Sequence, residues 1–183
     1  MDNIKEKIYQ IIKNQFQRDF FYDQGSITTT ENINVQIKKF EKENPNASTI
    51  FLSNLSNSFP NIKMENFTHF FNHDRCIRFL IQISEEKRFI CQLSVFNYFS
   101  VYQHSAKLAH SRYEYEVPHY VNINESEICD EIYRCSNVNS IRAIWLSRDI
   151  LNEVVDEFSI LDDDPLFRYE IKISDILFTD HYI

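Results

Sequence analysis

Hydrophobic and polar positions alternate most regularly between residues 77 and 95. Two alternating runs flank Glu85-Glu86-Lys87, and this period of two is typical of strands with one buried face. The segment therefore predicts a long β-hairpin with those three residues as its loop. This register gives four apolar same-face pairs, namely Ile83 with Phe89, Ile81 with Cys91, Phe79 with Leu93 and Ile77 with Val95.

The second strand of this hairpin continues in the sequence to Tyr102. A strand of that length is expected to contain a bulge or a bend, which we place near Asn97. The opposite face of the hairpin carries Leu80 and Ile90, together with Phe96 and Tyr98. We therefore expect both faces of the hairpin to be at least partly covered.

The part of the chain before the hairpin has a helical pattern. Apolar residues recur every three or four positions over residues 4–20, and Gly25 follows as a stop signal. A second helix is predicted over residues 30–43, although Ile33, Val35 and Ile37 also alternate as in a strand. Residues 48–57 fit a short helix less clearly. A further helix is expected over Met64, Phe67, Phe70 and Phe71.

After the hairpin, strands and helices are mixed. Strands are predicted over residues 112–117, 141–146 and 167–173. A helix is expected over residues 125–135, with Asn124 and Glu127 as a capping box and Ile123 and Ile128 at the positions of a hydrophobic staple. Another helix is expected over residues 147–158.

This order of elements predicts the fold class α+β. We expect a single domain, residues 1–183, whose antiparallel sheet is built on the central hairpin with helices packed against it. Residues 1–72 would form a mostly helical part, and residues 75–183 would form the sheet with two inserted helices.

The composition narrows the function classes. The chain has 183 residues, of which 43% are hydrophobic and 25% are charged, as in ordinary globular proteins. It contains one glycine, so the glycine-rich phosphate loops of nucleotide-binding proteins are excluded. Turn positions with positive φ therefore fall to Asn or Asp.

Cysteine usage and hydropathy predict a cytoplasmic protein. The four cysteines, at positions 76, 91, 129 and 135, show no CxxC spacing, so we expect free and mostly buried thiols. Polar residues interrupt the N-terminal segment, which is therefore not expected to be a signal peptide. No apolar run is long enough for a membrane span.

Charge is distributed unevenly along the chain. Residues 1–111 contain 13 Lys and Arg against 11 Asp and Glu, whereas residues 112–183 contain 6 against 16. The net charge of −8 therefore arises in the C-terminal part. A negative surface of this kind accelerates association with a cationic protein and repels nucleic acid.

We therefore expect an acidic binding protein whose partner is a basic protein. The specific hypothesis is an inhibitor that occludes a basic, nuclease-type toxin, similar in kind to bacterial immunity proteins, although no residue motif supports a family match. No cofactor and no metal are expected. The predicted partner-binding residues are Glu127, Asp130, Glu131, Glu153, Asp156, Glu157, Asp162, Asp163 and Asp164.

Two alternatives remain open at this stage. The first is a hydrolase-like enzyme, in which His104, His110 or His119 meets a carboxylate in a closed pocket. The second is a structural or scaffolding subunit, for which a large apolar surface patch is expected. His69 and His73 have the spacing of a metal-ligating pair on a helix, but no third ligand is evident.

Overall fold

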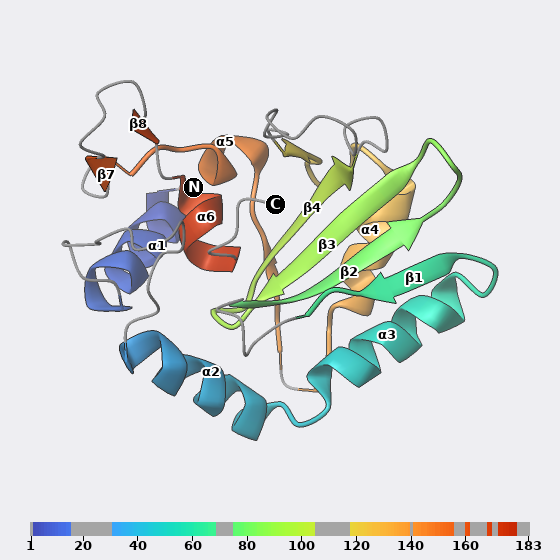
Figure 1. Ribbon diagram of the computed structural model, residues 1–183, viewed down its shortest axis with the longest axis horizontal. Coiled ribbons are helices and arrows are strands. Elements are labelled where there is room, and N and C mark those ends of the chain that lie inside the picture. Colours follow the sequence, from blue (N-terminus) through green and yellow to red (C-terminus); the bar gives the residue numbers. More distant parts are fainter. Residues whose placement is uncertain are drawn as a thin grey trace.

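The computed structural model describes residues 2–15, 31–68, 75–104, 118–139, 141–155, 160–161, 168–169 and 172–178. These ranges contain helices and strands in mixed order (Figure 1). The elements are α1 (Asp2–Gln15), α2 (Glu31–Glu43), α3 (Ala47–Ser58), β1 (Lys63–Asn66), β2 (Cys76–Gln82), β3 (Arg88–Ser94), β4 (Tyr98–His104), β5 (His119–Tyr120), α4 (Glu127–Cys135), β6 (Ile144–Trp145), α5 (Arg148–Leu151), β7 (Ile160–Leu161), β8 (Arg168–Tyr169) and α6 (Ile173–Phe178).

A mostly antiparallel sheet forms the centre of the fold. Its strand order is β1-β2-β3-β4-β5, and β6 joins it by pairing with β4 in parallel. Strands β7 and β8 form a separate two-stranded sheet. The predicted α+β class with a sheet built on the central hairpin is confirmed, and the parallel pair β4–β6 makes the sheet a mixed one.

The hairpin has the predicted faces but a different register. Ile81 lies opposite Phe89, and Phe79 lies opposite Cys91, so the pairing is shifted by two residues from the predicted one. A shift of two keeps every side chain on its face, and therefore the alternation does not distinguish the two registers. The backbone amide of Ile83 donates to the carbonyl of Lys87 at 2.9 Å, which closes the turn one residue earlier than predicted.

The expected bulge near Asn97 is instead a tight turn. Strand β3 ends at Ser94, the amide of Asn97 donates to the carbonyl of Ser94, and β4 runs back antiparallel to β3. Asn97 has a φ of 63°. Within the described ranges, the non-glycine residues with positive φ are all asparagines, at positions 46, 97, 124 and 139, which confirms that Asn takes the place of glycine in the turns.

The prediction of a helix around Met64 is wrong, because residues 63–66 form strand β1. Met64 pairs with Ile81 and Asn66 pairs with Phe79, so β1 extends the sheet at the outer edge of β2. Four residues are too few to show a period, and pairing with the hairpin decides their conformation. Phe70 and Phe71 lie outside the described residues, as do His69 and His73.

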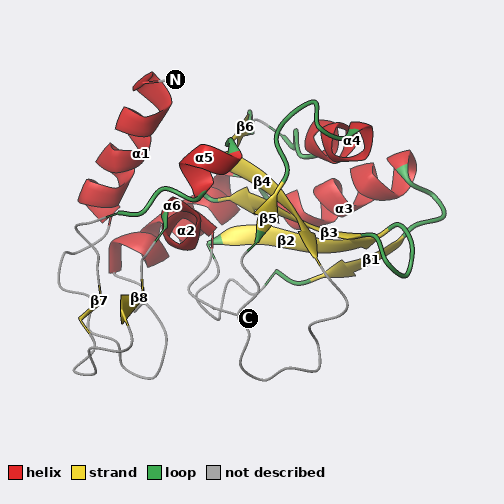
Figure 2. Ribbon diagram, turned by 90° about the horizontal axis from the view of Figure 1, so that it is seen from above, coloured by secondary structure: helices red, strands yellow, loops and turns green. Residues whose placement is uncertain are grey.

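Helices α3 and α4 cover one face of the sheet (Figure 2). Phe51 of α3 packs edge-on against Phe79 with ring centroids 5.3 Å apart, and it also contacts Phe99 of β4. The ring centroids of Tyr133 in α4 and Trp145 in β6 lie 5.2 and 5.5 Å from the ring centroid of Phe99. One hydrophobic cluster joins this layer to the buried faces of α1, α2, α5 and α6.

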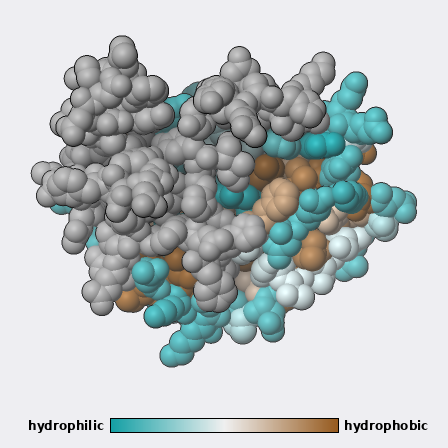
Figure 3. Space-filling view, in the orientation of Figure 1, coloured by the Kyte–Doolittle hydropathy of each residue, from teal (hydrophilic) through white to brown (hydrophobic). Residues whose placement is uncertain are grey.

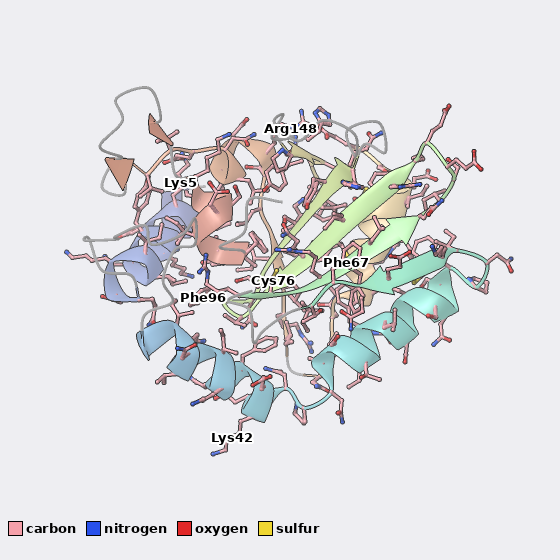
Figure 4. The ribbon with its side chains drawn as sticks, in the orientation of Figure 1. Lys5, Lys42, Phe67, Cys76, Phe96 and Arg148 are labelled. Atoms are coloured by element: carbon pink, nitrogen blue, oxygen red, sulfur yellow. The ribbon has the colours of Figure 1, made fainter. Side chains whose placement is uncertain are left out.

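The other face of the sheet is more polar and is also covered, as expected. Arg78, Gln92 and Ser100 lie side by side on three neighbouring strands and are all buried. The Ser100 hydroxyl donates to Oε1 of Gln92 at 3.1 Å. On the side of the molecule seen in Figure 3, apolar side chains over the strands are interspersed with hydrophilic ones. Phe67, labelled in Figure 4, follows β1 beside β2, where its backbone amide donates to the carbonyl of Arg78 at 2.9 Å.

The C-terminal part departs most from the sequence-based prediction. The helix expected to reach residue 158 ends at Leu151, and Val154 forms a bridge with Lys172. Helix α6 begins within the strand predicted over residues 167–173, and its last turn is capped by the buried guanidinium group of Arg75. The strand predicted over residues 112–117 lies outside the described residues. None of the helices in the described part is both long and apolar enough to span a membrane.

Candidate partner-binding surface

Helix α4 forms because its sequence separates apolar from charged positions. Its buried residues are Cys129, Ile132 and Cys135, which face the sheet. The Oγ atom of Ser126 accepts a hydrogen bond from the amide of Cys129, so Ser126 is the N-cap, whereas the sequence pointed to Asn124. The acidic residues of the first turn lie at the positive end of the helix dipole, which they stabilise.

Three of the predicted partner-binding residues come together on the outer face of α4. Asp130 Oδ1 accepts a hydrogen bond from the backbone amide of Asn124 at 2.9 Å. Glu131 accepts one from Ser58 at 2.7 Å and pairs with Arg134 at 2.8 Å. The Glu127 carboxylate makes no hydrogen bond or ion pair with any residue that the structure describes. This face therefore keeps a negative charge beside one arginine.

An open depression of about 450 Å³ lies against this helix. Glu127 and Asp130 contribute carboxylates to its lining, and Ile123 contributes an apolar side chain that is 50% exposed. Its complete lining consists of Ile123, Asn124, Glu127, Asp130, Tyr133 and Arg134. The depression thus combines apolar and acidic surface. Protein interfaces have a similar combination, with an apolar core and a polar rim.

The sequence places Ile123 at a hydrophobic-staple position, and in the structure its side chain is half exposed. The loop between β5 and α4 turns at Asn124, where φ is 66°, and leaves the isoleucine half exposed. Tyr133 and Ile123 were not among the predicted partner-binding residues. Their periodicity indicates packing, and no sequence signal distinguishes an exposed apolar residue from a buried one at these positions.

Arg148 holds this loop from the side of α5 (Figure 4). Its guanidinium group donates to the carbonyl of Tyr120 at 2.7 Å and to Glu125 at 2.8 Å. Asn122 donates two further hydrogen bonds to Glu125, from its backbone and from its side chain. These hydrogen bonds from Asn122, and after them the charge of Arg148, lower the pKa of Glu125.

Glu153 lies apart from α4, beside helix α1. Its carboxylate pairs with the ammonium group of Lys5 and accepts a hydrogen bond from the Tyr9 hydroxyl at 3.0 Å. The hydrogen bond from Lys5 lowers the pKa of Glu153. Figures 1 and 4 show α1 and Lys5 on the opposite side of the molecule from α4. The structure therefore does not bring Glu153 together with the acidic residues of α4, and a basic residue from the N-terminal part balances its charge.

The other predicted partner-binding residues lie outside the described residues. They are Asp156, Glu157, Asp162, Asp163 and Asp164. Their role stays a prediction.

Two side chains of types used in catalysis, Cys91 and His119, do not line the depression. Cys91 is fully buried, and desolvation raises the pKa of its thiol, as expected for an inert cysteine. His119 is exposed near the exposed carboxylate of Glu125, and it does not line the depression. His110 lies outside the described residues. Among the residues that the structure describes, no group of three His, Cys, Asp or Glu is placed to hold a metal ion.

The chain matches no protein-family model, and neither a curated protein nor a solved structure shows significant similarity to it.

Proposed function

We propose that this protein is an acidic binding protein that inhibits a basic protein, specifically a nuclease-type toxin, by occluding it. The observation that carries the proposal is the outer face of α4, where Glu127, Asp130 and Glu131 gather beside an open depression. A nuclease presents cationic surface to the phosphates of its substrate. Carboxylates held at the surface of a rigid helix oppose such a surface and compete with the nucleic acid for it.

The uneven charge of the whole chain supports the same partner. The net charge of −8 favours encounter with a cationic protein and disfavours direct binding of nucleic acid. The apolar part of the depression supplies the desolvated centre that protein interfaces require in addition to a charged rim. Among the described residues, the exposed large apolar side chains are Tyr9, Val35, Ile123 and Ile144, which lie on separate elements. Because these exposed apolar side chains are separated, they favour a small interface over the broad apolar surface of a scaffolding subunit.

The experiment first asks whether a secreted toxin domain is encoded beside the gene for this chain. A domain found there is called the neighbouring toxin domain. Purified chain is added to that domain during digestion of DNA or RNA. We expect a stoichiometric complex and loss of nuclease activity, with less inhibition at high salt. Undiminished digestion in the presence of excess chain contradicts the proposal, and so does a genome that encodes no toxin beside this gene.

Charge reversal then tests the predicted residues separately. Glu127→Lys is expected to slow association with the neighbouring toxin domain, because it places a cation at the centre of the surface. Asp156→Lys combined with Glu157→Lys tests the predicted residues outside the described part. Unchanged association of this second variant removes those two residues from the proposed surface and leaves the role of α4 intact.

A further inference from the structure

Ile123 is exposed in a loop whose backbone is held by hydrogen bonds. Hydrogen bonds hold the backbone on both sides of it: Trp145 Nε1 donates to the carbonyl of Val121 at 3.1 Å, and Asp130 accepts from the amide of Asn124. Holding an exposed apolar side chain in place does not stabilise the free protein. A loop that is already ordered, however, loses little conformational entropy when a partner binds.

The neighbouring residue Asn122 is held equally firmly. Its amide donates to Glu125 at 2.8 Å, and its side-chain oxygen accepts from the amide of Arg148 at 2.8 Å. Arg148 also binds Glu125 and the carbonyl of Tyr120, so one arginine connects the end of β5 and two points of the loop to α5. We call this group, Asn122, Glu125 and Arg148, the clamp. It fixes the direction in which Ile123 leaves the backbone.

The lining of the depression defines the chemistry of what fits beside Ile123. Ile123 and Tyr133 line the depression with an aliphatic and an aromatic residue, and Glu127 and Asp130 add negative charge. Arg134 also lines the depression, and its guanidinium group is held by Glu131. A lysine or arginine side chain matches this mixture, because its methylene stem is apolar and its end is cationic.

We propose that the depression is the docking point for a lysine or arginine side chain of the cationic partner, with Ile123 as the apolar anchor that the clamp holds in position. The methylene stem of the inserted side chain packs on Ile123, and its cation faces Glu127 and Asp130. Arg148 is a positioning residue, since it acts through the loop. This inference rests on the proposed function for the identity of the partner and specifies where and how that partner binds.

Dissociation of the neighbouring toxin domain tests the anchor. We expect Ile123→Ser to raise the dissociation rate by about tenfold or more, as loss of a central interface residue does. Ile144→Ser removes another exposed isoleucine from β6 and is the matched control, with an unchanged rate expected. Arg148→Ala is expected to raise the rate in the same direction, and Arg148→Lys to restore it only in part, because lysine lacks the guanidinium fork. Circular dichroism checks that each variant is folded.

A second probe is independent of the toxin. Tri-arginine amide is titrated into the labelled full-length chain, and amide chemical shifts are followed by NMR. We expect changes to concentrate at Ile123, Glu127 and Asp130 and to be weaker at Glu85 and Glu86, which are an exposed acidic pair on the hairpin turn. Equal changes at both places overturn the docking point.

The combined outcomes separate the two proposals. Inhibition of the toxin with unchanged dissociation of Ile123→Ser overturns the anchor and leaves the proposed function standing. Absence of toxin binding together with tri-arginine shifts at the depression overturns the toxin as partner and supports the docking point.

Discussion

The carboxylate of Glu153 pairs with the ammonium group of Lys5, a residue 148 positions earlier in the chain. This contact ties the segment after α5 to α1 and removes one carboxylate from the predicted acidic surface. The acidic residues of α4 have no such basic partner from the N-terminal part among the described residues, since Glu131 pairs within its own helix. The negative surface that the structure describes is therefore centred on α4.

The Lys5–Glu153 pair predicts a contribution to stability that depends on pH. The pKa of Glu153 is lower in the folded state than its ordinary value of 4.5. The stabilisation is therefore complete above the pKa of the unfolded chain and is lost as the pH falls through the folded-state pKa. For a partly exposed pair it amounts to at most about 1 kcal/mol.

Glu153→Gln is expected to lower the free energy of unfolding near pH 7 and to leave it unchanged below the folded-state pKa. Urea denaturation across this pH range measures the difference. Glu41→Gln, on the solvent face of α2, is the control. A difference between wild type and Glu153→Gln that persists at the acid end would show that the contact acts through packing and not through charge.

The N-cap of α4 predicts a local loss of stability. Ser126→Ala removes the acceptor for the amide of Cys129 and is expected to lower the free energy of unfolding by about 1 kcal/mol. Ser147 precedes α5 without a side-chain cap hydrogen bond, so Ser147→Ala is the matched control and is expected to have little effect. Chemical denaturation of both variants provides the comparison. Equal losses would mean that α4 does not depend on this cap.

The turn at Asn97 predicts that two substitutions differ in their effect on stability. Asn97→Ala forces a β-carbon into the left-handed region and is expected to cost about 1 kcal/mol. Asn97→Gly is expected to be close to neutral, because glycine adopts positive φ without strain. Thermal unfolding of both variants tests the turn. If alanine were tolerated as well as glycine, the left-handed conformation would not constrain this turn.

The contact between Arg75 and the end of α6 predicts a larger effect. The Arg75 side chain is fully buried and donates to the carbonyls of Asp175 and Ile176, both at 2.7 Å. Arg75→Met leaves these carbonyls without their donor and is expected to lower the free energy of unfolding by about 3 kcal/mol. Arg142→Met, at an exposed arginine, is expected to change it by less than about 0.5 kcal/mol. Comparable losses in denaturation experiments would refute a special role for Arg75.

The sequence indicates the sheet well where alternation is long. The alternation between Ile77 and Val95 predicts the apolar faces of β2 and β3. It does not predict their register, because a shift by two residues preserves both faces. Strand β1 is too short for its period to be recognised. The helix predicted to reach residue 158 stops at Leu151, because the chain there pairs with Lys172, a contact that local pattern does not reveal.

The candidate surface is also only partly predictable, because some of its features depend on contacts between residues that are distant in the chain. The acidic positions on α4 follow from the separation of charged and apolar residues along one helix. The loop that carries the exposed Ile123 is held by Arg148, whose bond to Glu125 joins positions 23 apart in the chain. Likewise, the neutralisation of Glu153 depends on Lys5, which is distant in sequence. Contacts of this kind arise only when the chain is folded.

The association rate with the neighbouring toxin domain, measured from low to high salt, tests the acidic surface of α4 most directly. Glu127→Lys with Glu131→Lys is compared with Glu85→Lys with Glu86→Lys, which changes the net charge equally but on the hairpin turn. We predict that the α4 variant associates about tenfold more slowly at low salt, that the hairpin variant stays close to wild type, and that the difference shrinks as salt screens the charges. Equal rates for the two variants would contradict the account.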